Sequence, residues 1–440
     1  MSIWIRRYTL VTLFTLSSLL HTSGQNLSFS SWTEAFEYAK EHQPDFLIWE
    51  KTADQQTYEV RNAKGGLMPQ LKAYGNYDNF LQLPVQLVPS EAFGGEPGTF
   101  TEIQFGTQYQ LDVGLQASLP LVDTKAWNRV KSAKLEKQLN NSELQATRQN
   151  HKEQLARTYY LTLLSQEALE LSEDNYKAAD SIHQAAKHQF DQGVLEPLPY
   201  QRLKAAAFRA KSQYHQQVSS TSSNSNKLKY LIGLDQGDSI HLTETVTYQA
   251  MPEGIPSYLL ETQPDYQGAT VSLKLAERNL KASRQRHLPT LNAVGRYSQQ
   301  AWSDDMRMSN YTWFSTAMIG LRLEWNIFGG NLTRNQINST KLQREIAEAR
   351  LRQTEQHLIQ EQHDLFTDLA QNLKILESYR ETYTVYQDNY RLAQIQLREG
   401  VISADELLQV QQELWDNQRQ YLNSMADYLI AKALIEIKSE

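Results

Sequence analysis

Polar side chains alternate with apolar ones in three short segments of this sequence. The polar residues are Gln110, Asp112 and Gln116 in the first segment, Arg296 in the second, and Arg322 and Glu324 in the third. Amide, carboxylate and guanidinium groups in such rows bind water and ions, and no nucleophile is paired with a base among them. The pattern therefore indicates a hydrated surface rather than a catalytic centre.

Short motifs that mark common catalytic sites are absent from the sequence. It contains no P-loop, no GxSxG and no HExxH, and none of its 10 histidines lies four residues from another. The glycine-rich stretch FGGEPG at 93–98 lacks the strand-to-helix context of a phosphate site. We therefore expect no enzyme activity, no cofactor and no metal site.

The first 24 residues have the features of a secretory signal peptide. Arg6 and Arg7 precede an apolar stretch, and small residues follow it, so we expect cleavage near Gln25. Cleavage would remove two positive charges and no acid, which changes the formal net charge from -7 to -9 and excludes a basic nucleic-acid surface. No later apolar run reaches about 18 residues, so any membrane-spanning segments would have to be strands.

The chain repeats itself in the same order of parts. LMPQLKAYGNY at 67–77 returns as HLPTLNAVGRY at 287–297, and GLQASLPLVD at 114–123 returns as GLRLEWNIFG at 320–329. We therefore predict a first structural repeat over 25–230, an equatorial connector with one small strand over 231–256, and a second repeat over 257–440. Residues 81–100, an insertion in the first repeat rich in Pro and Gly, are predicted to form a loop.

Alternation with period two predicts a β-hairpin in each repeat, at about 70–121 and about 289–328. In each repeat the first strand begins just after a Pro. At the start of a strand the missing N–H of Pro removes no hydrogen bond from the interior of the sheet. A soluble β-sandwich and a set of membrane strands both fit this alternation, because each has one apolar and one polar face.

The helical segments favour the membrane interpretation. Residues 124–192 and 331–399 contain no Gly or Pro, and each run could form a helix of roughly 100 Å, longer than a globular domain needs. Each run stops at a Gly, where a left-handed residue would end the helix, and a second helical stretch follows at 200–232 and 405–437. The sequence therefore predicts two very long coiled-coil hairpins.

Four strands cannot close a barrel, and open edges in lipid leave backbone groups unpaired. Two chains would give eight strands and a filled interior, whereas three would give twelve strands and a passage. The polar face favours three chains around a water-filled conduit. An exported periplasmic coiled-coil scaffold without a pore is the alternative.

The sequence resembles the TolC-type outer membrane factors over residues 31–437. The matching parts are SWTEAFEYAKEHQPDF at 31–46, the doubled Pro-x-Leu strand entries, LRLEWNIFGGNLTRNQI at 321–337 and LREGVISADELLQVQQEL at 397–414. The resemblance implies a homotrimer in the outer membrane with a twelve-stranded β-barrel and a twelve-helix periplasmic α-barrel. It also implies a periplasmic adaptor protein and an inner membrane transporter as partners in a tripartite efflux pump or a type I secretion system.

The resemblance also assigns site residues. It implies a periplasmic constriction at Glu406 and Gln409, of which only Glu406 is acidic. The six polar residues named above are expected to line the barrel lumen because the alternation of the strands places them on the inward face. The resemblance places adaptor contacts at the hairpin tips, which are Gly193, Val194, Gly400 and Val401. An ordinary first-turn acid and ordinary turn geometry are the simpler interpretations of Glu406 and of the tips.

Overall fold

The computed structural model describes residues 26–244, 259–307 and 311–439. The proposed signal peptide and residues 245–256 of the proposed connector lie outside these ranges. The described residues form two compact units, each drawing on both sequence repeats. We call them the sheet unit, within 53–141 and 268–352, and the helical unit, within 26–52, 142–244, 259–267 and 353–439.

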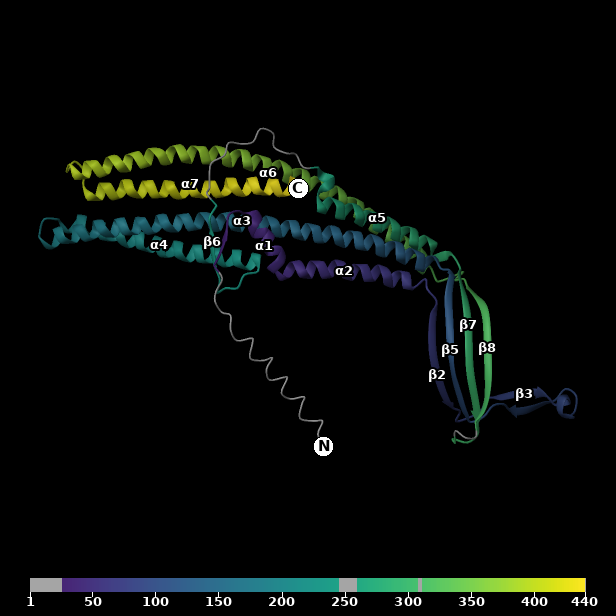
Figure 1. Cartoon of the computed structure of the whole chain (residues 1–440). Coiled ribbons are helices and arrows are strands. Elements are labelled where there is room, and N and C mark those ends of the chain that lie inside the picture. Colours follow the sequence, from purple (N-terminus) through teal and green to yellow (C-terminus); the bar gives the residue numbers. More distant parts are fainter. Residues whose placement is uncertain (1–25, 245–258, 308–310, 440) are drawn as a thin grey trace, which may run out of the picture. The chain divides into compact units, whose positions relative to one another are not determined.

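The sheet unit contains a four-stranded antiparallel sheet (Figure 1). Its order is β2 (Gln70–Asn79), β5 (Tyr109–Val122), β7 (Thr290–Ser303) and β8 (Thr312–Glu324). Both predicted hairpins are therefore present, and β2 and β7 begin directly after Pro69 and Pro289.

The two hairpins have equivalent registers. Gln70 lies opposite Ser118 in the first hairpin, and Thr290 lies opposite Glu324 in the second. These pairs are related by offsets of 290 − 70 = 220 and 324 − 118 = 206, the same offsets that relate the repeated sequence segments. The pairing of β5 with β7 joins one hairpin to the other.

The prediction of a loop over 81–100 was wrong. This stretch contains β3 (Val85–Pro89) and a 3-10 helix (Ser90–Phe93), and β3 pairs with β4 (Phe100–Gln104) as a separate small hairpin. Gly94, with φ of 80°, turns the chain after the 3-10 helix. The Pro and Gly residues mark the ends and the turn of this hairpin, and the strands themselves are free of Gly.

The predicted helical hairpins are confirmed. The first consists of α3 (Thr124–Asp191) and α4 (Pro197–Ile232), and the second consists of α6 (Leu332–Arg398) and α7 (Ala404–Ser439). Asp123 starts α3 by accepting hydrogen bonds from the backbone N–H groups of Lys125 and Ala126 at 2.8 and 3.1 Å. Among the described residues, no helix is both long and apolar enough to cross a membrane.

Shorter elements connect these parts. They are β1 (Asn26–Phe29), α1 (Trp32–His42), α2 (Pro44–Gly65), β6 (Ser239–Leu242), α5 (Pro264–Arg284) and two further 3-10 helices at Leu260–Thr262 and Gln285–His287. The small strand predicted in the connector is β6, and it pairs in parallel with β1, which the sequence did not predict.

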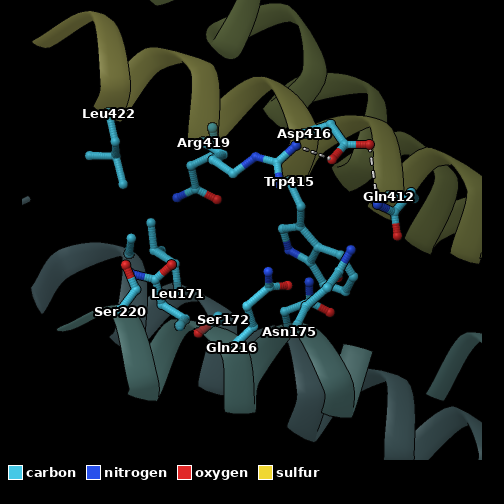
Figure 2. A pocket seen from close by; sticks show the side chains of 14 residues that line it. Leu171, Ser172, Asn175, Gln216, Ser220, Gln412, Trp415, Asp416, Arg419 and Leu422 are labelled. Atoms are coloured by element: carbon cyan, nitrogen blue, oxygen red, sulfur yellow. Dashed lines mark hydrogen bonds and ion pairs between the residues drawn. The ribbon is translucent and has the colours of Figure 1, made fainter. Parts of the chain in front are cut away.

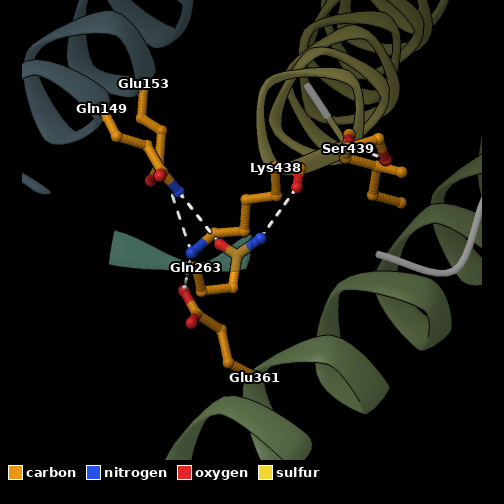
Figure 3. Close-up of polar contacts among 7 residues, drawn as sticks. Gln149, Glu153, Gln263, Glu361, Lys438 and Ser439 are labelled. Carbon is orange, nitrogen blue, oxygen red and sulfur yellow. Dashed lines mark hydrogen bonds and ion pairs between the residues drawn. The ribbon is translucent and has the colours of Figure 1, made fainter. Parts of the chain in front are cut away.

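The main hydrophobic core lies in the helical unit. It gathers buried side chains of α1, α3, α4, α6 and α7, including Tyr159, Leu376 and Tyr428. Beside it, the buried Lys438 near the end of α7 has its ammonium group 2.7 Å from Glu361 and 3.5 Å from Glu153 (Figure 3). Gln263 donates from Nε2 to the backbone oxygen of Lys438 at 2.9 Å. These contacts join the last turn of α7 to α3, to α6 and to the segment before α5.

Candidate functional site

One face of the four-stranded sheet carries all six residues predicted to line a lumen. Gln116 lies opposite Arg296, and Arg296 lies opposite Met318, which has the same parity along β8 as Arg322 and Glu324. Gln110 and Asp112 have the same parity along β5 as Gln116. The register thus brings these side chains together on one face, as the alternation predicted, and their role as a lumen lining stays a prediction.

Three of the strands are tied together on this face by one polar cluster. The guanidinium group of Arg296 forms an ion pair with Asp112 and donates from Nε to the hydroxyl of Tyr74 at 2.5 Å. The Tyr74 hydroxyl donates in turn to Asp112 at 3.4 Å. The Asp112 side chain is only 12% exposed, and its two oxygens accept from Arg296 and Tyr74, which compensates for its partial burial.

The opposite face of the sheet is apolar and open. Ile319 is 94% exposed, and Leu71, Tyr297, Trp313 and Leu321 are each at least half exposed on the same face. Soluble monomers rarely expose a continuous apolar surface of this kind, because its contact with water is unfavourable. An apolar medium or partner must therefore cover this face.

Neither edge strand of the sheet has a second strand partner in the described part of the chain. β2 pairs only with β5, and β8 pairs only with β7, so strands of 10 and 13 residues each leave one row of backbone groups without strand partners among the described residues. Long, regular edges of this type are templates for pairing with another chain.

Both hairpin tips have the same turn geometry. Gly193 and Gly400 have φ of 75° and 71°, as the sequence predicted for left-handed helix ends. The next residue donates its N–H five residues back, from Val194 to Gln189 at 2.8 Å and from Val401 to Gln396 at 2.8 Å. This Schellman arrangement leaves the two valine side chains 73% and 70% exposed. Each tip thus presents an exposed apolar side chain directly after a left-handed glycine turn.

Glu406 caps the helix in which it lies. Its Oε2 accepts from the backbone N–H of Ser403 at 2.8 Å, and its own N–H donates to the Ser403 hydroxyl at 3.2 Å. This reciprocal pair is a capping box at the start of α7. Gln409, one turn further along, is exposed like Glu406. The structure therefore gives Glu406 a structural role, and a constriction at these two residues stays a prediction.

A contact between the two hairpins near their tips was not predicted. Arg202 of α4 forms an ion pair with Asp405 of α7 at 3.1 Å. Beside this pair, Leu203 packs in one cluster with Ala186 of α3 and Leu408 of α7. No signal in the sequence joins residues of α4 to residues of α7, because the two helices are brought together only by the tertiary fold.

The fold of this chain is similar to those of solved outer membrane proteins. The chain is similar to the Campylobacter jejuni CmeC outer membrane channel, with a TM-score of 0.73 and 17% identity, over 92% of this chain and 85% of that one. It is also similar to the outer membrane protein VceC of Vibrio cholerae, with a TM-score of 0.73 and 16% identity, over 93% and 96% of the two chains. The fold is thus that of the TolC-like outer membrane channels.

The sequence assigns the family as well. The profile of the outer membrane efflux protein family matches residues 36–234 and 255–436. The chain therefore belongs to the outer membrane efflux protein family.

Relatives named as efflux proteins match part of this chain. The chain is 25% identical over 287 residues to the probable efflux pump outer membrane protein TtgC of Pseudomonas putida, a match that spans 63% of this chain and 58% of the relative. It is 23% identical over 282 residues to the cation efflux system protein CusC of Escherichia coli, spanning 61% and 59% of the two chains. The matched part is less than two thirds of the length of each relative.

Proposed function

We propose that three copies of this chain form a passive exit duct through the outer membrane, as the outer component of a tripartite efflux pump or a type I secretion system. The observation that carries this proposal is the four-stranded sheet, with an exposed apolar face, a polar face and two free edges. In lipid, such a sheet is stable only when every edge is paired. Closure by copies of the same chain covers both edges, and lipid covers the apolar face.

The order of the strands supports a head-to-tail closure. Because all three pairings in the sheet are antiparallel, its first strand, β2, and its last strand, β8, run in opposite directions. β8 of one copy can therefore pair antiparallel with β2 of the next. Along the chain, α2 leads into β2, β5 leads into α3, α5 leads into β7 and β8 leads into α6, so all helical connections leave from one end of the strands. A ring with its axis along the membrane normal keeps every helix on the periplasmic side.

The polar face supports three copies rather than two. An eight-stranded barrel has an interior that side chains fill, whereas this face carries charged residues that need water. The charged residues of the strands on this face are Lys72, Asp78, Asp112, Arg296, Arg322 and Glu324. Since three are acidic and three are basic, the strands by themselves give the twelve-stranded lumen little preference for one sign of charge.

At the periplasmic end, the α-barrel of twelve helices would narrow at Glu406 and Gln409. The ion pair of Arg202 with Asp405 would hold the second hairpin against the first, and since both side chains are exposed, this link is weak enough to release. The exposed Val194 and Val401 would then contact a periplasmic adaptor protein, which connects the duct to an inner membrane transporter.

The first test is the mass of the detergent-solubilised protein, measured by light scattering, with single-channel recording on the same sample. A trimer that conducts is the expected result. A monomer or dimer without conductance would refute a closed pore, and the exported coiled-coil scaffold would then account better for the long helices.

A second test separates the two roles of Glu406. Glu406→Gln keeps the hydrogen bonds of the capping box but removes the charge, whereas Ser403→Ala weakens the cap by about 1 kcal/mol and keeps the charge. We expect single-channel conductance to change in Glu406→Gln and not in Ser403→Ala, with trimer assembly intact in both. Conductance of the unmodified channel that stays constant from about pH 4 to pH 8, across carboxylate titration, would contradict a carboxylate constriction.

A further inference from the structure

The helical unit contains a cavity that the proposed passage of solutes does not use. Side chains of α3, α4 and α7 line a partly open cavity of about 330 Å³, close to the lower limit of small-molecule pockets. Figure 2 shows Trp415 reaching from α7 toward Asn175 of α3 and Gln216 of α4. The cavity thus combines one large aromatic ring with several amide groups.

An unpaired polar atom points to a missing ligand at this place. Asn175 is only 6% exposed, and its Oδ1 has no hydrogen-bond partner within the described part of the chain. Buried amide oxygens are nearly always paired, because leaving one unpaired after removing it from water is unfavourable. The cavity therefore needs a group that donates a hydrogen bond to Asn175.

The rim of the cavity on α7 holds both donors and acceptors. Asp416 accepts from Nε2 of Gln412 at 3.1 Å and pairs with Arg419 at 3.5 Å. Because Arg419 compensates its charge, Asp416 does not make the cavity strongly anionic, and it is the one carboxylate among the described lining residues. A divalent cation, which prefers several anionic oxygen ligands, does not fit this set.

We propose that this cavity binds a small neutral sugar, a mono- or disaccharide. The flat face of Trp415 suits the apolar face of a pyranose ring. Hydroxyl groups both donate and accept, so one sugar can donate to Asn175 and Asp416 and accept from Arg419 or a glutamine amide. A purely apolar ligand would fill the cavity but leave the Asn175 oxygen unpaired.

The test uses the full-length protein in a detergent without a sugar head group, since a maltoside would compete. Glucose, maltose, N-acetylglucosamine and its β-1,4-linked disaccharide are titrated, with saturation-transfer NMR and calorimetry as readouts. We expect saturable binding of at least one of these sugars. Trp415→Leu and Asn175→Leu should each weaken that binding by about tenfold or more, as expected for losing a main contact or a hydrogen bond to a buried group.

Trp127→Leu is the matched control, because this tryptophan is exposed on α3 within the sheet unit and lies outside the cavity. It should leave sugar binding unchanged. Absence of saturable binding by all four sugars up to about 10 mM, a range that includes weak specific sites, would overturn the proposal and indicate a cavity filled by water only. Binding that persists in Trp415→Leu or Asn175→Leu, whichever folds, would also overturn it.

This site and the proposed duct can fail separately. A protein that binds a sugar but does not conduct would support the sugar site and refute the duct. A protein that conducts but binds no sugar would support the duct and refute the sugar site.

Discussion

Gly114 of β5 lies against the backbone of β7, and we predict that even a methyl group there opens the sheet. A Cβ at this position would lie 2.5 Å from the backbone oxygen of Tyr297 and 2.9 Å from the Cα of Ser298. Both contacts are with backbone atoms, so no side-chain rotation can relieve them, and β7 itself would have to move. Gly114→Ala therefore acts on the junction between the two hairpins.

The magnitude follows from these distances. Overpacking typically costs about 1–3 kcal/mol, and contacts below 3 Å with a paired strand place Gly114→Ala at the upper end, about 3 kcal/mol for each chain. Gly295→Ala in β7 is the matched control, because its Cβ would meet only Met318 O at an ordinary 3.8 Å. Replacing a strand glycine by alanine without a clash stabilises by about 0.5 kcal/mol or more.

Hydrogen exchange followed by mass spectrometry measures this difference within the sheet. A loss of about 3 kcal/mol raises the population of the open state, and with it the exchange of β5 and β7 amides, about 100-fold. Gly295→Ala should exchange no faster than the unmodified protein. Equal protection of β5 in both variants would refute the close approach at Gly114.

Two further perturbations test the helical unit. Lys438→Met leaves Glu153 and Glu361 facing each other without a cation, and because the Glu361 side chain is 31% exposed we expect a loss of about 2 kcal/mol rather than the full cost of a broken buried pair. Urea unfolding should show this loss, and the triple variant that also carries Glu153→Gln and Glu361→Gln should recover most of it. Burial lowers the pKa of His151 below its ordinary 6.5. Below about pH 6.5 the unfolded chain therefore binds a proton at this histidine more readily than the folded chain does, so the free energy of unfolding should fall as the pH drops. His151→Gln should flatten this part of the pH profile of the melting temperature, and an unchanged slope would contradict a neutral buried histidine.

Much of the architecture could be predicted from local patterns. Period-two alternation defined β5 and β8, and the long stretches without Gly or Pro defined all four ends of α3 and α6 to within one residue. These elements repeat one simple pattern over many residues, so an error at one position does not alter the prediction. The β3–β4 hairpin was missed because its strands have only five residues each and lie between several Pro and Gly residues.

Contacts between distant elements could not be predicted. The cluster of Arg296 with Asp112 depends on the β5–β7 register, and the pair of Arg202 with Asp405 depends on the packing of two hairpins. By contrast, the cap at Glu406 was present in the sequence as Ser403-x-x-Glu406, the signature of a capping box. That signal could have identified the structural role of this glutamate.

The internal repeat predicts the junction that would close the ring. Within one chain, the second strand of the first hairpin, β5, pairs with the first strand of the second hairpin, β7. Between copies, the second strand of the second hairpin, β8, would pair in the same way with β2, the first strand of the next copy's first hairpin. Within the chain, Gln116 lies opposite Arg296. Applying the offsets gives 116 + 206 = 322 and 296 − 220 = 76, so Arg322 should lie opposite Asn76 of the next copy.

Cysteine cross-linking tests this register, because the sequence contains no native cysteine. Directly opposed strand residues have Cα atoms within the range of about 4.4–6.8 Å that a disulfide needs, so the variant with Arg322→Cys and Asn76→Cys should form covalent trimers on oxidation. Met318→Cys with Asn76→Cys is the control, since Met318 lies four residues, or about 13 Å, further along the same face. Equal cross-linking of both pairs, or none of the first, would mean that the copies do not continue the register set by β5 and β7. Covalent trimers from the first pair alone would show that the contact between copies repeats the contact between the two halves of one chain.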